Sequence, residues 1–256
     1  MQEINKNEII RNKLVKSQSS PFKAYQDMTA GKINLIKFIY YEIVTSLLGP
    51  MPGGLGFFLR KKFYPPLFKE VGNGLIIGRN VVIRHPYNIK IGNFVTIDDN
   101  CLLDGRGGDG IILEDNVIIN RNCMVQAKTG TVRLGMRTSI GSNSVIVSMS
   151  GVYIGEAVLT AGNCYFSAGA YNFDDLETPI MDQTAFSKGP IEIGTHSWFG
   201  TGAVVLDGVT IGEGAVIGSC AMVNKDIPAF SIAVGIPAKI QKYRGDILNK
   251  HKLANH

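Results

Sequence analysis

Residues 91–103 read Ile91-Gly-Asn-Phe-Val-Thr-Ile97-Asp-Asp-Asn-Cys-Leu-Leu103, so an aliphatic residue returns at every sixth position. The spacing continues from about Ile77 to Val223. Neither the period of a helix nor the alternation of a strand produces a spacing of six residues. A coil with three flat faces does, because the first residue of each six points into the core and each coil is buried only by its neighbours. The spacing predicts an all-β solenoid, a parallel β-helix. Further triples of sixes begin at Leu113, Leu134, Ile154, Ile193 and Ile211.

Two more columns fix the register of the coils. The fourth position of the middle six holds residues that tolerate a left-handed backbone at a corner. The fifth position holds only small residues, which suit a buried column between stacked coils. The fourth column is Asn100, Asn122, Asn143, Asn163, Gly202 and Cys220, and the fifth is Cys101, Cys123, Ser144, Cys164, Ala203 and Ala221.

Composition limits the function classes. Three of the four cysteines fall in the buried column and no CxxC occurs, which argues against a disulfide framework and a zinc site. Only His85 and His196 lie in the coils, whereas a β-helix carbonic anhydrase needs three histidines around its metal. No metal is therefore expected. Residues 1–16 are polar and charged, unlike a secretion signal, so we expect a cytoplasmic protein.

Positive charge is concentrated before the coils. Residues 1–70 hold eleven Lys and Arg and five Asp and Glu, a net charge of +6, against +5 for the whole chain. The coils and tail are thus close to neutral, at −1. A neutral solenoid without a basic, aromatic face argues against nucleic-acid binding.

Residues 1–70 are expected to form a helical, amphipathic extension. Ser20 and Pro21 are typical of a helix start, and that helix should end at Gly31. Apolar stretches follow at 33–48 and 55–63, each shorter than a membrane-spanning helix. Together with their flanking lysines and arginines they favour a membrane-surface contact through residues 20–65 and a peripheral place at the inner face of the cell membrane. The alternative is that these helices cap the first coil or pack on another subunit.

Residues 71–239 form the expected solenoid domain. Its regular spacing is interrupted once, by an insertion at about 172–190, and long insertions in regular solenoids are usually functional. The glycine-rich segment 104–110 lacks the strand and helix of a phosphate loop and is interpreted as a turn. The tail, 240–256, is expected to form a short helix.

Several motifs in the last third resemble the bacterial hexapeptide-repeat acyltransferases, especially the sugar and polysaccharide O-acetyltransferases. They are Ile193-Gly-Thr-His-Ser-Trp-Phe-Gly200, Gly208-Val-Thr-Ile-Gly212, Val223-Asn-Lys-Asp-Ile-Pro228 and Gly235-Ile-Pro-Ala-Lys239, together with the insertion that begins Asn172-Phe-Asp-Asp. The resemblance covers about residues 75–243.

The resemblance implies a left-handed β-helix that forms a homotrimer with active sites in clefts between subunits. Acetyl-CoA would be the co-substrate, and its pantetheine arm would pass the small residues Gly202, Ala203, Ser219 and Cys220. Lys225 and Lys239 match positions that could meet the nucleotide phosphates, and Trp198 could line the cleft. The alternatives are solvated lysines and a tryptophan that packs on the next subunit.

The family's usual histidine base is replaced. The position at the end of the six before the insertion holds Tyr171, a poor base at neutral pH because tyrosine ordinarily ionises near pH ~10. The other candidates are Asp174 and Asp175 in the insertion and His85, which lies four coils earlier in the same column as Ser148 and Ala168. His196 occupies a corner position and is interpreted as structural.

Three functional hypotheses follow. The first is direct acetyl transfer from acetyl-CoA to a hydroxyl of a sugar or a lipid-linked precursor of a surface polysaccharide. The second is an amino-sugar N-acetyltransferase, because an amine needs less help from a base. The third, motivated by Tyr171, is a catalytically impaired scaffold at the membrane.

Overall fold

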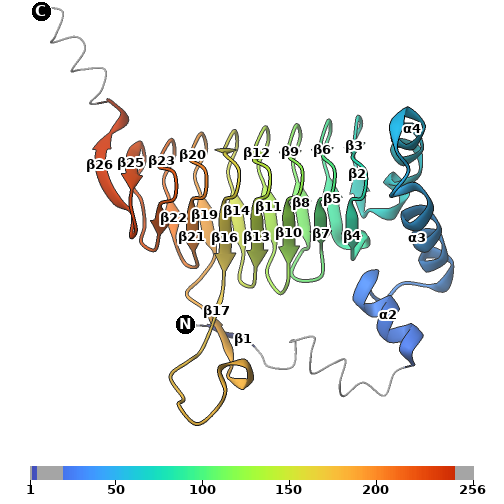
Figure 1. Ribbon diagram of the computed structural model, residues 1–256, viewed down its shortest axis with the longest axis horizontal. Coiled ribbons are helices and arrows are strands. Elements are labelled where there is room, and N and C mark those ends of the chain that lie inside the picture. The colour runs from blue at the N-terminus through green and yellow to red at the C-terminus, as the bar shows by residue number, and fades with distance from the viewer. Residues whose placement is uncertain (1, 5–19, 246–256) are drawn as a thin grey trace, which may run out of the picture.

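The computed structural model describes residues 2–4 and 20–245, and within them the chain is a parallel β-helix with a helical extension (Figure 1). The coil is left-handed and has about seven turns. Its three sides are named here sheets I, II and III, in the order in which each turn visits them. Sheet I contains β2 (Glu70–Val71), β5 (Ile89–Ile91), β8 (Ile111–Leu113), β11 (Val132–Leu134), β14 (Val152–Ile154), β19 (Ile191–Ile193) and β22 (Thr210–Ile211).

The other two sides stack in the same order along the axis. Sheet II contains β3 (Ile76–Ile77), β6 (Thr96–Ile97), β9 (Ile118–Ile119), β12 (Ser139–Ile140), β15 (Leu159–Thr160), β20 (Trp198–Phe199), β23 (Val216–Ile217), β25 (Ser231–Val234) and β26 (Lys239–Tyr243). Sheet III contains β4 (Val82–Arg84), β7 (Leu102–Asp104), β10 (Met124–Ala127), β13 (Val145–Ser148), β16 (Tyr165–Ala168), β21 (Val204–Leu206) and β24 (Met222–Val223). All neighbours are parallel except β25 and β26.

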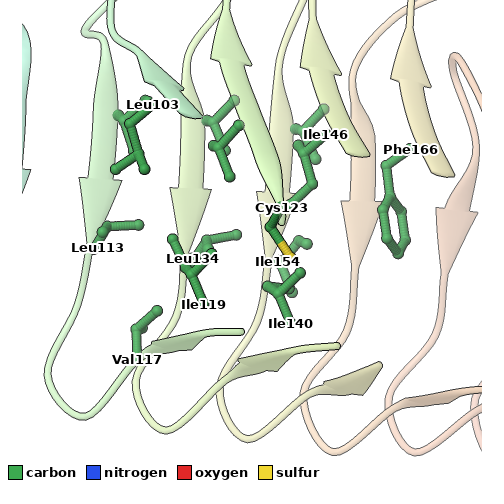
Figure 2. Packing of buried hydrophobic residues seen from close by; sticks show 14 of the residues in the cluster. Leu103, Leu113, Val117, Ile119, Cys123, Leu134, Ile140, Ile146, Ile154 and Phe166 are labelled. Atoms are coloured by element: carbon green, nitrogen blue, oxygen red, sulfur yellow. The ribbon is translucent and has the colours of Figure 1, made fainter. Parts of the chain in front are cut away.

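The predicted inward column forms the core. Every residue that begins a six, from Ile77 to Val223, is at most 4% exposed. Figure 2 shows some of these side chains, among them Leu103, Ile146 and Phe166, pointing into the space between the sheets. The Phe166 ring meets that of Phe199 edge-on, with centroids 5.4 Å apart. The one polar member, Thr160, is satisfied because its hydroxyl accepts a hydrogen bond from the Gly141 N–H (2.8 Å).

Both columns that set the register are confirmed. The fourth-column residues sit at the corner between sheets II and III with φ between 58° and 73°. Asn122 donates to the Asn143 side chain across coils (3.1 Å), so the corner asparagines also join neighbouring turns. The fifth-column residues are all buried, and burial raises the pKa of the Cys164 thiol, as expected for an unreactive structural cysteine.

Helices cover the N-terminal end of the solenoid. They are α2 (Pro21–Thr29), α3 (Leu35–Leu48) and α4 (Gly53–Phe63), followed by the 3-10 turns η2 (Pro65–Leu67) and η3 (Pro86–Asn88). Ser20 caps α2 as predicted, Asn34 caps α3, and the chain turns at Gly31 with φ +80°. No helix in the described ranges is long and apolar enough to cross a bilayer.

Two short strands differ from the sequence prediction. Residues 239–243 form β26, antiparallel to β25, where a helix was expected from residue 240, and the rest of that predicted helix lies outside the described residues. A strand forms here because the last edge of sheet II needs hydrogen-bond partners. At the other terminus β1 (Gln2–Ile4) pairs with a strand of the insertion, so the 1–70 extension is not wholly helical.

Candidate functional site

The insertion leaves the coil after β16 and returns at β19. It contains β17 (Ala170–Tyr171), the 3-10 turn η4 (Ile180–Asp182) and β18 (Ala185–Ser187), and β17 and β18 pair antiparallel. Figure 1 shows it projecting from the side of the solenoid. A groove of ≈ 410 Å³ lies within it, lined by Asn172, Asp174, Asp175, Thr178, Gln183 and Thr184. Two of the predicted catalytic residues therefore line one groove.

The two aspartates have different surroundings. Asp175 shapes the loop, because its Oδ1 accepts hydrogen bonds from the N–H groups of Glu177 (2.9 Å) and Thr178 (3.2 Å). Asp174 is exposed in the same groove, and Tyr171 is about half exposed at the end of β17. All three predicted groups of the insertion are exposed, and Asp175 differs from Asp174 and Tyr171 in that its Oδ1 holds the turn.

Gln183 organises the insertion and escaped the sequence prediction. It is 7% exposed, and its Nε2 donates to the carbonyl oxygens of Asp175 and Thr178, both at 2.7 Å. The contacts hold the turn that carries the aspartates. The sequence offered no signal for it, because the spacing of six stops at β16.

His85 belongs to a different part of the structure. It lies at the corner between sheets III and I, four strands before β16, or ~19 Å along the axis. Its Nδ1 is 2.8 Å from Asp104 Oδ1 and its Nε2 is 3.0 Å from the Asp27 carbonyl oxygen. Arg106 Nη2 contacts the other Asp104 oxygen at 3.3 Å. Since both ring nitrogens meet acceptors, His85 joins α2 to the first coils.

The expected pantetheine residues gather at the corner between sheets II and III. Ser219 and Cys220 are exposed, whereas Ala203 is fully buried, so only its backbone is available to a ligand. The glycines beside them leave room: a Cβ added at Gly200 would lie 2.7 Å from Ser219 Oγ, and one at Gly202 would lie 3.3 Å from Cys220 Sγ. The corner therefore presents backbone and small side chains along its edge.

The remaining cofactor candidates lie near the same end. Trp198 points outward from sheet II, 48% exposed, in register between Leu159 and Val216. Lys225 follows β24 and Lys239 begins β26; both are exposed, and within residues 20–245 neither forms an ion pair. His196 sits at a left-handed corner (φ 58°), its Nδ1 3.5 Å from Glu213.

Within one chain the two halves of the candidate site point in different directions. The insertion leaves from the corner between sheets III and I, and the remaining side of the triangle, sheet II, carries Trp198. In Figure 1 the insertion hangs below the solenoid while β20 and β23 run along its upper edge. One copy of the chain therefore does not bring Trp198 and Asp174 to the same place.

A second groove, of ≈ 560 Å³, runs over the outer side of sheet I. Its lining includes four glycines and the side chains of Glu114, Arg133, Tyr153 and Glu192. Arg133 is paired with Glu114. None of the predicted site residues lines this groove, and we therefore do not assign the catalytic site to it. Among the described residues, no group of three or more His, Cys, Asp or Glu could hold a metal ion.

Comparisons with known proteins find the hexapeptide repeat in two parts of the coil. The family described as Bacterial transferase hexapeptide (six repeats) matches residues 190–225, and the Hexapeptide repeat of succinyl-transferase matches 94–127. A dTDP-4-amino-4,6-dideoxy-D-glucose acyltransferase of Escherichia coli is 33% identical over 174 residues, 67% of this chain and 80% of that protein. The chain belongs to the hexapeptide-repeat acyltransferases.

Other relatives match shorter parts of their own length. A probable acetyltransferase of Mycobacterium tuberculosis is 42% identical over 120 residues, 47% of this acyltransferase chain but 40% of that protein. A crystal structure of an N-acyltransferase mutant from Bacillus cereus, in complex with dTDP and coenzyme A, superimposes with a TM-score of 0.50 at 22% identity. It covers 74% of this chain and 93% of that one, and this likeness supports the fold.

Proposed function

We propose that the chain is an acetyl-CoA-dependent O-acetyltransferase that acts on a sugar, as the free glycan or as a lipid-linked precursor of a surface polysaccharide. Acyl transfer to a sugar rests on the 33% identity to a relative named as a dTDP-4-amino-4,6-dideoxy-D-glucose acyltransferase, and transfer to a hydroxyl rests on the motifs of the last third that resemble the sugar O-acetyltransferases. The insertion supports it, because a groove with exposed polar groups stands beside the coils that carry the small-residue corner.

The proposed site lies between subunits of a homotrimer. Trp198 and the insertion occupy opposite sides of one coil, so a complete site needs sheet II of one copy against the insertion of the next. The outward columns of sheets II and III support such contacts, since they are rich in exposed or half-exposed apolar side chains such as Leu159, Trp198 and Tyr165. Sheet I instead carries Glu70, Lys90, Arg133 and Glu192, as a solvent-facing side would.

Acetyl-CoA would lie along that cleft. Its pantetheine amides would meet the backbone at Gly202 and Ala203 and the small side chains of Ser219 and Cys220. Lys225 and Lys239 would supply point charges for the phosphates, and Trp198 would present its ring to the cleft.

In the transfer step the acceptor hydroxyl oxygen attacks the thioester carbonyl carbon. Asp174 takes the hydroxyl proton as the new C–O bond forms, because it is the insertion carboxylate that is exposed in the groove and not used by the turn. The phenolic O–H of Tyr171 donates a hydrogen bond to the developing oxyanion and keeps its proton. The C–S bond then breaks as the carbonyl re-forms, and the CoA thiolate leaves and takes the proton from Asp174. Asp175 and Gln183 position the loop, and His85 holds α2 on the coil.

A second candidate is an N-acetyltransferase of an amino sugar. Two observations favour it: the E. coli relative is named for an amino sugar, and Tyr171 stands where the family places its histidine. A neutral amine attacks a thioester without prior loss of a proton, so the site would need no strong base.

The test combines calorimetry of acetyl-CoA binding with thiol release from matched sugar acceptors that differ only in a hydroxyl or an amine. O-transfer predicts turnover with the hydroxyl sugar and a loss of about 10²–10⁴-fold in kcat for Asp174→Asn, with acetyl-CoA affinity retained. Asp182→Asn, another exposed carboxylate of the insertion, is the matched control and should keep its rate. Tyr171→His should raise the rate of acetyl transfer to the hydroxyl acceptor at neutral pH.

The remaining outcomes decide against O-transfer. Turnover with the amine alone, and little change in Asp174→Asn, would identify the N-acetyltransferase. Failure to bind acetyl-CoA would overturn both and leave the scaffold hypothesis.

A further inference from the structure

The outer side of α3 is an uncovered apolar stripe. Five aliphatic residues recur there at helical spacing and are between 48% and 81% exposed: Leu35, Ile36, Ile39, Ile43 and Leu47. Phe38, Tyr41 and Val44 on the opposite side are buried: Phe38 packs edge-on against Phe22 and Tyr25 of α2, and the Tyr41 hydroxyl donates to the Ile83 carbonyl of β4 (2.8 Å). The stripe therefore faces away from the first coil, and Figure 1 shows α3 lying across the end of the solenoid.

The neighbouring helix α4 also carries exposed apolar residues. Leu55 and Phe58 are 65% and 60% exposed, one turn apart, and Lys61 and Lys62 follow on the exposed side. The buried Arg60 holds α4 in place, because its guanidinium donates to the carbonyl oxygens of Leu48, Met51 and Ile77. The exposed apolar residues of α3 and α4 are thus held at the end of the solenoid, and together they are named here the platform.

Charge indicates what covers the platform. The helical extension carries exposed lysines at positions 23, 32, 37, 61, 62 and 69, of which Lys37 lies over the Tyr87 ring, 4.9 Å from its centroid. The acids of residues 20–70 are largely engaged: Glu42 accepts from the Tyr25 hydroxyl, and Glu70 pairs with Lys90 (2.8 Å). Exposed apolar side chains on a lysine-rich extension match an anionic bilayer, where the apolar side chains enter the interface and the lysines meet lipid phosphates. A second copy would present like charges.

We propose that α3 and α4 dock on an anionic lipid bilayer and that the solenoid stands upright on it, with its axis along the membrane normal. The insertion then leaves the coil four strands above β4, ~19 Å. With a helix layer of ~10 Å beneath, it stands about 30 Å above the lipid surface. If the proposed transfer function holds, the acceptor is the outer part of an extended lipid-linked glycan and not the sugar next to the lipid.

Docking is tested by co-sedimentation of the full chain with vesicles of equimolar phosphatidylcholine and phosphatidylglycerol, and of phosphatidylcholine alone. The expected result is binding to the anionic vesicles that weakens with salt. Ile43→Glu should lower the partition coefficient at least about tenfold. Phe94→Glu, which adds the same charge at a 62% exposed corner of the solenoid, is the matched control and should change it little. Lys61→Gln and Lys62→Gln should each lower it about fivefold.

Orientation is tested by energy transfer to headgroup-labelled lipid. Cys220 is the exposed cysteine, while the other three are buried. It precedes β24, six strands from β4, so an upright solenoid holds a dye there about 40 Å from the lipid. A dye on Phe94→Cys, in a Cys220→Ser background, lies beside β6 and should come within about 15 Å.

Three results would overturn the proposal. The first is equal partitioning of Ile43→Glu and wild type between vesicles and solution. The second is equal energy transfer to the labelled lipid from the two dyes. The third is a change of oligomeric state in Ile43→Glu without loss of vesicle binding. The last result would assign the stripe to a second copy. None of these measurements uses acetyl transfer, so a failure here is distinct from a failure of the proposed function.

Discussion

At the residue scale, Tyr64 and Tyr41 form a natural contrast. Both are buried, Tyr41 in α3 and Tyr64 at the end of α4, but Tyr64 Oη has no hydrogen-bond partner among the described residues, whereas Tyr41 Oη donates to the Ile83 carbonyl. A buried hydroxyl without a partner costs free energy, and a satisfied one contributes about 1 kcal/mol. Tyr64→Phe should therefore leave the free energy of unfolding unchanged or raise it by about 1 kcal/mol, and Tyr41→Phe should lower it by about 1 kcal/mol. Thermal unfolding at neutral pH measures both.

Tyr64 and Tyr41 also predict how the free energy of unfolding changes at alkaline pH. Burial raises the pKa of Tyr64 to about 12 and also raises that of Tyr41, from an ordinary value of 10.0. The folded state thus favours the neutral phenols, and their contribution is fully present below pH 10 and is lost as the pH rises toward 12. Tyr64→Phe should be less sensitive than wild type over this interval. If Tyr64→Phe proves more destabilising than Tyr41→Phe at neutral pH, its hydroxyl does have a partner.

Residues that obey the spacing of six were predictable one by one. The corner residues Asn100 and Asn122 and the buried Cys123 follow from the register, because each position in the coil has one environment. The partners of His85 were not predictable. Asp104 lies 19 residues ahead and the Asp27 carbonyl 58 residues behind, and the latter contact depends on how α2 folds back on the coil.

At the scale of elements, Arg60 fixes α4 to the solenoid. It is 4% exposed and satisfies three carbonyl oxygens, two of them at and just after the C-terminal end of α3, where the helix dipole favours a cation. Arg60→Gln leaves some of these acceptors unpaired and should lower the free energy of unfolding by about 2–4 kcal/mol. Lys61→Gln, its exposed neighbour, should change it by less than about 0.5 kcal/mol.

Limited proteolysis provides a second measurement for Arg60. Cleavage within 50–64 should accelerate in Arg60→Gln while the solenoid stays intact. Equal cleavage rates in the two glutamine variants would contradict an anchoring role.

The helices could be predicted and two of the pairing strands could not. Ser20, Pro21 and Gly31 are local signals, and the structure places the boundaries of α2 beside them. β1 and β26 are antiparallel additions to existing edges. Their pairing is specified by which edge lies open in the folded chain, so no local pattern marks it. The groove of the insertion was likewise out of reach, since Gln183 builds it through contacts with backbone carbonyls.

At the scale of the whole molecule, the three sides of the coil differ in chemistry. Sheet I carries charged residues outward, and sheets II and III carry mostly apolar ones in register along the axis. A side with that much exposed apolar surface is typical of an interface. The separation of Trp198 from the insertion points to the same arrangement, since the proposed site then forms only where two copies meet.

A shared site has a direct consequence for mixed oligomers. Trp198→Ala and Asp174→Asn should each abolish most turnover when assembled alone. If the two variants are unfolded together and refolded as mixed trimers, a random cleft receives an intact tryptophan side and an intact insertion in about a quarter of cases. Acetyl transfer should therefore recover to about a quarter of the wild-type rate, measured as thiol release after light scattering has established the mass of the assembly. No recovery from a correctly assembled mixture would mean that one chain supplies both groups.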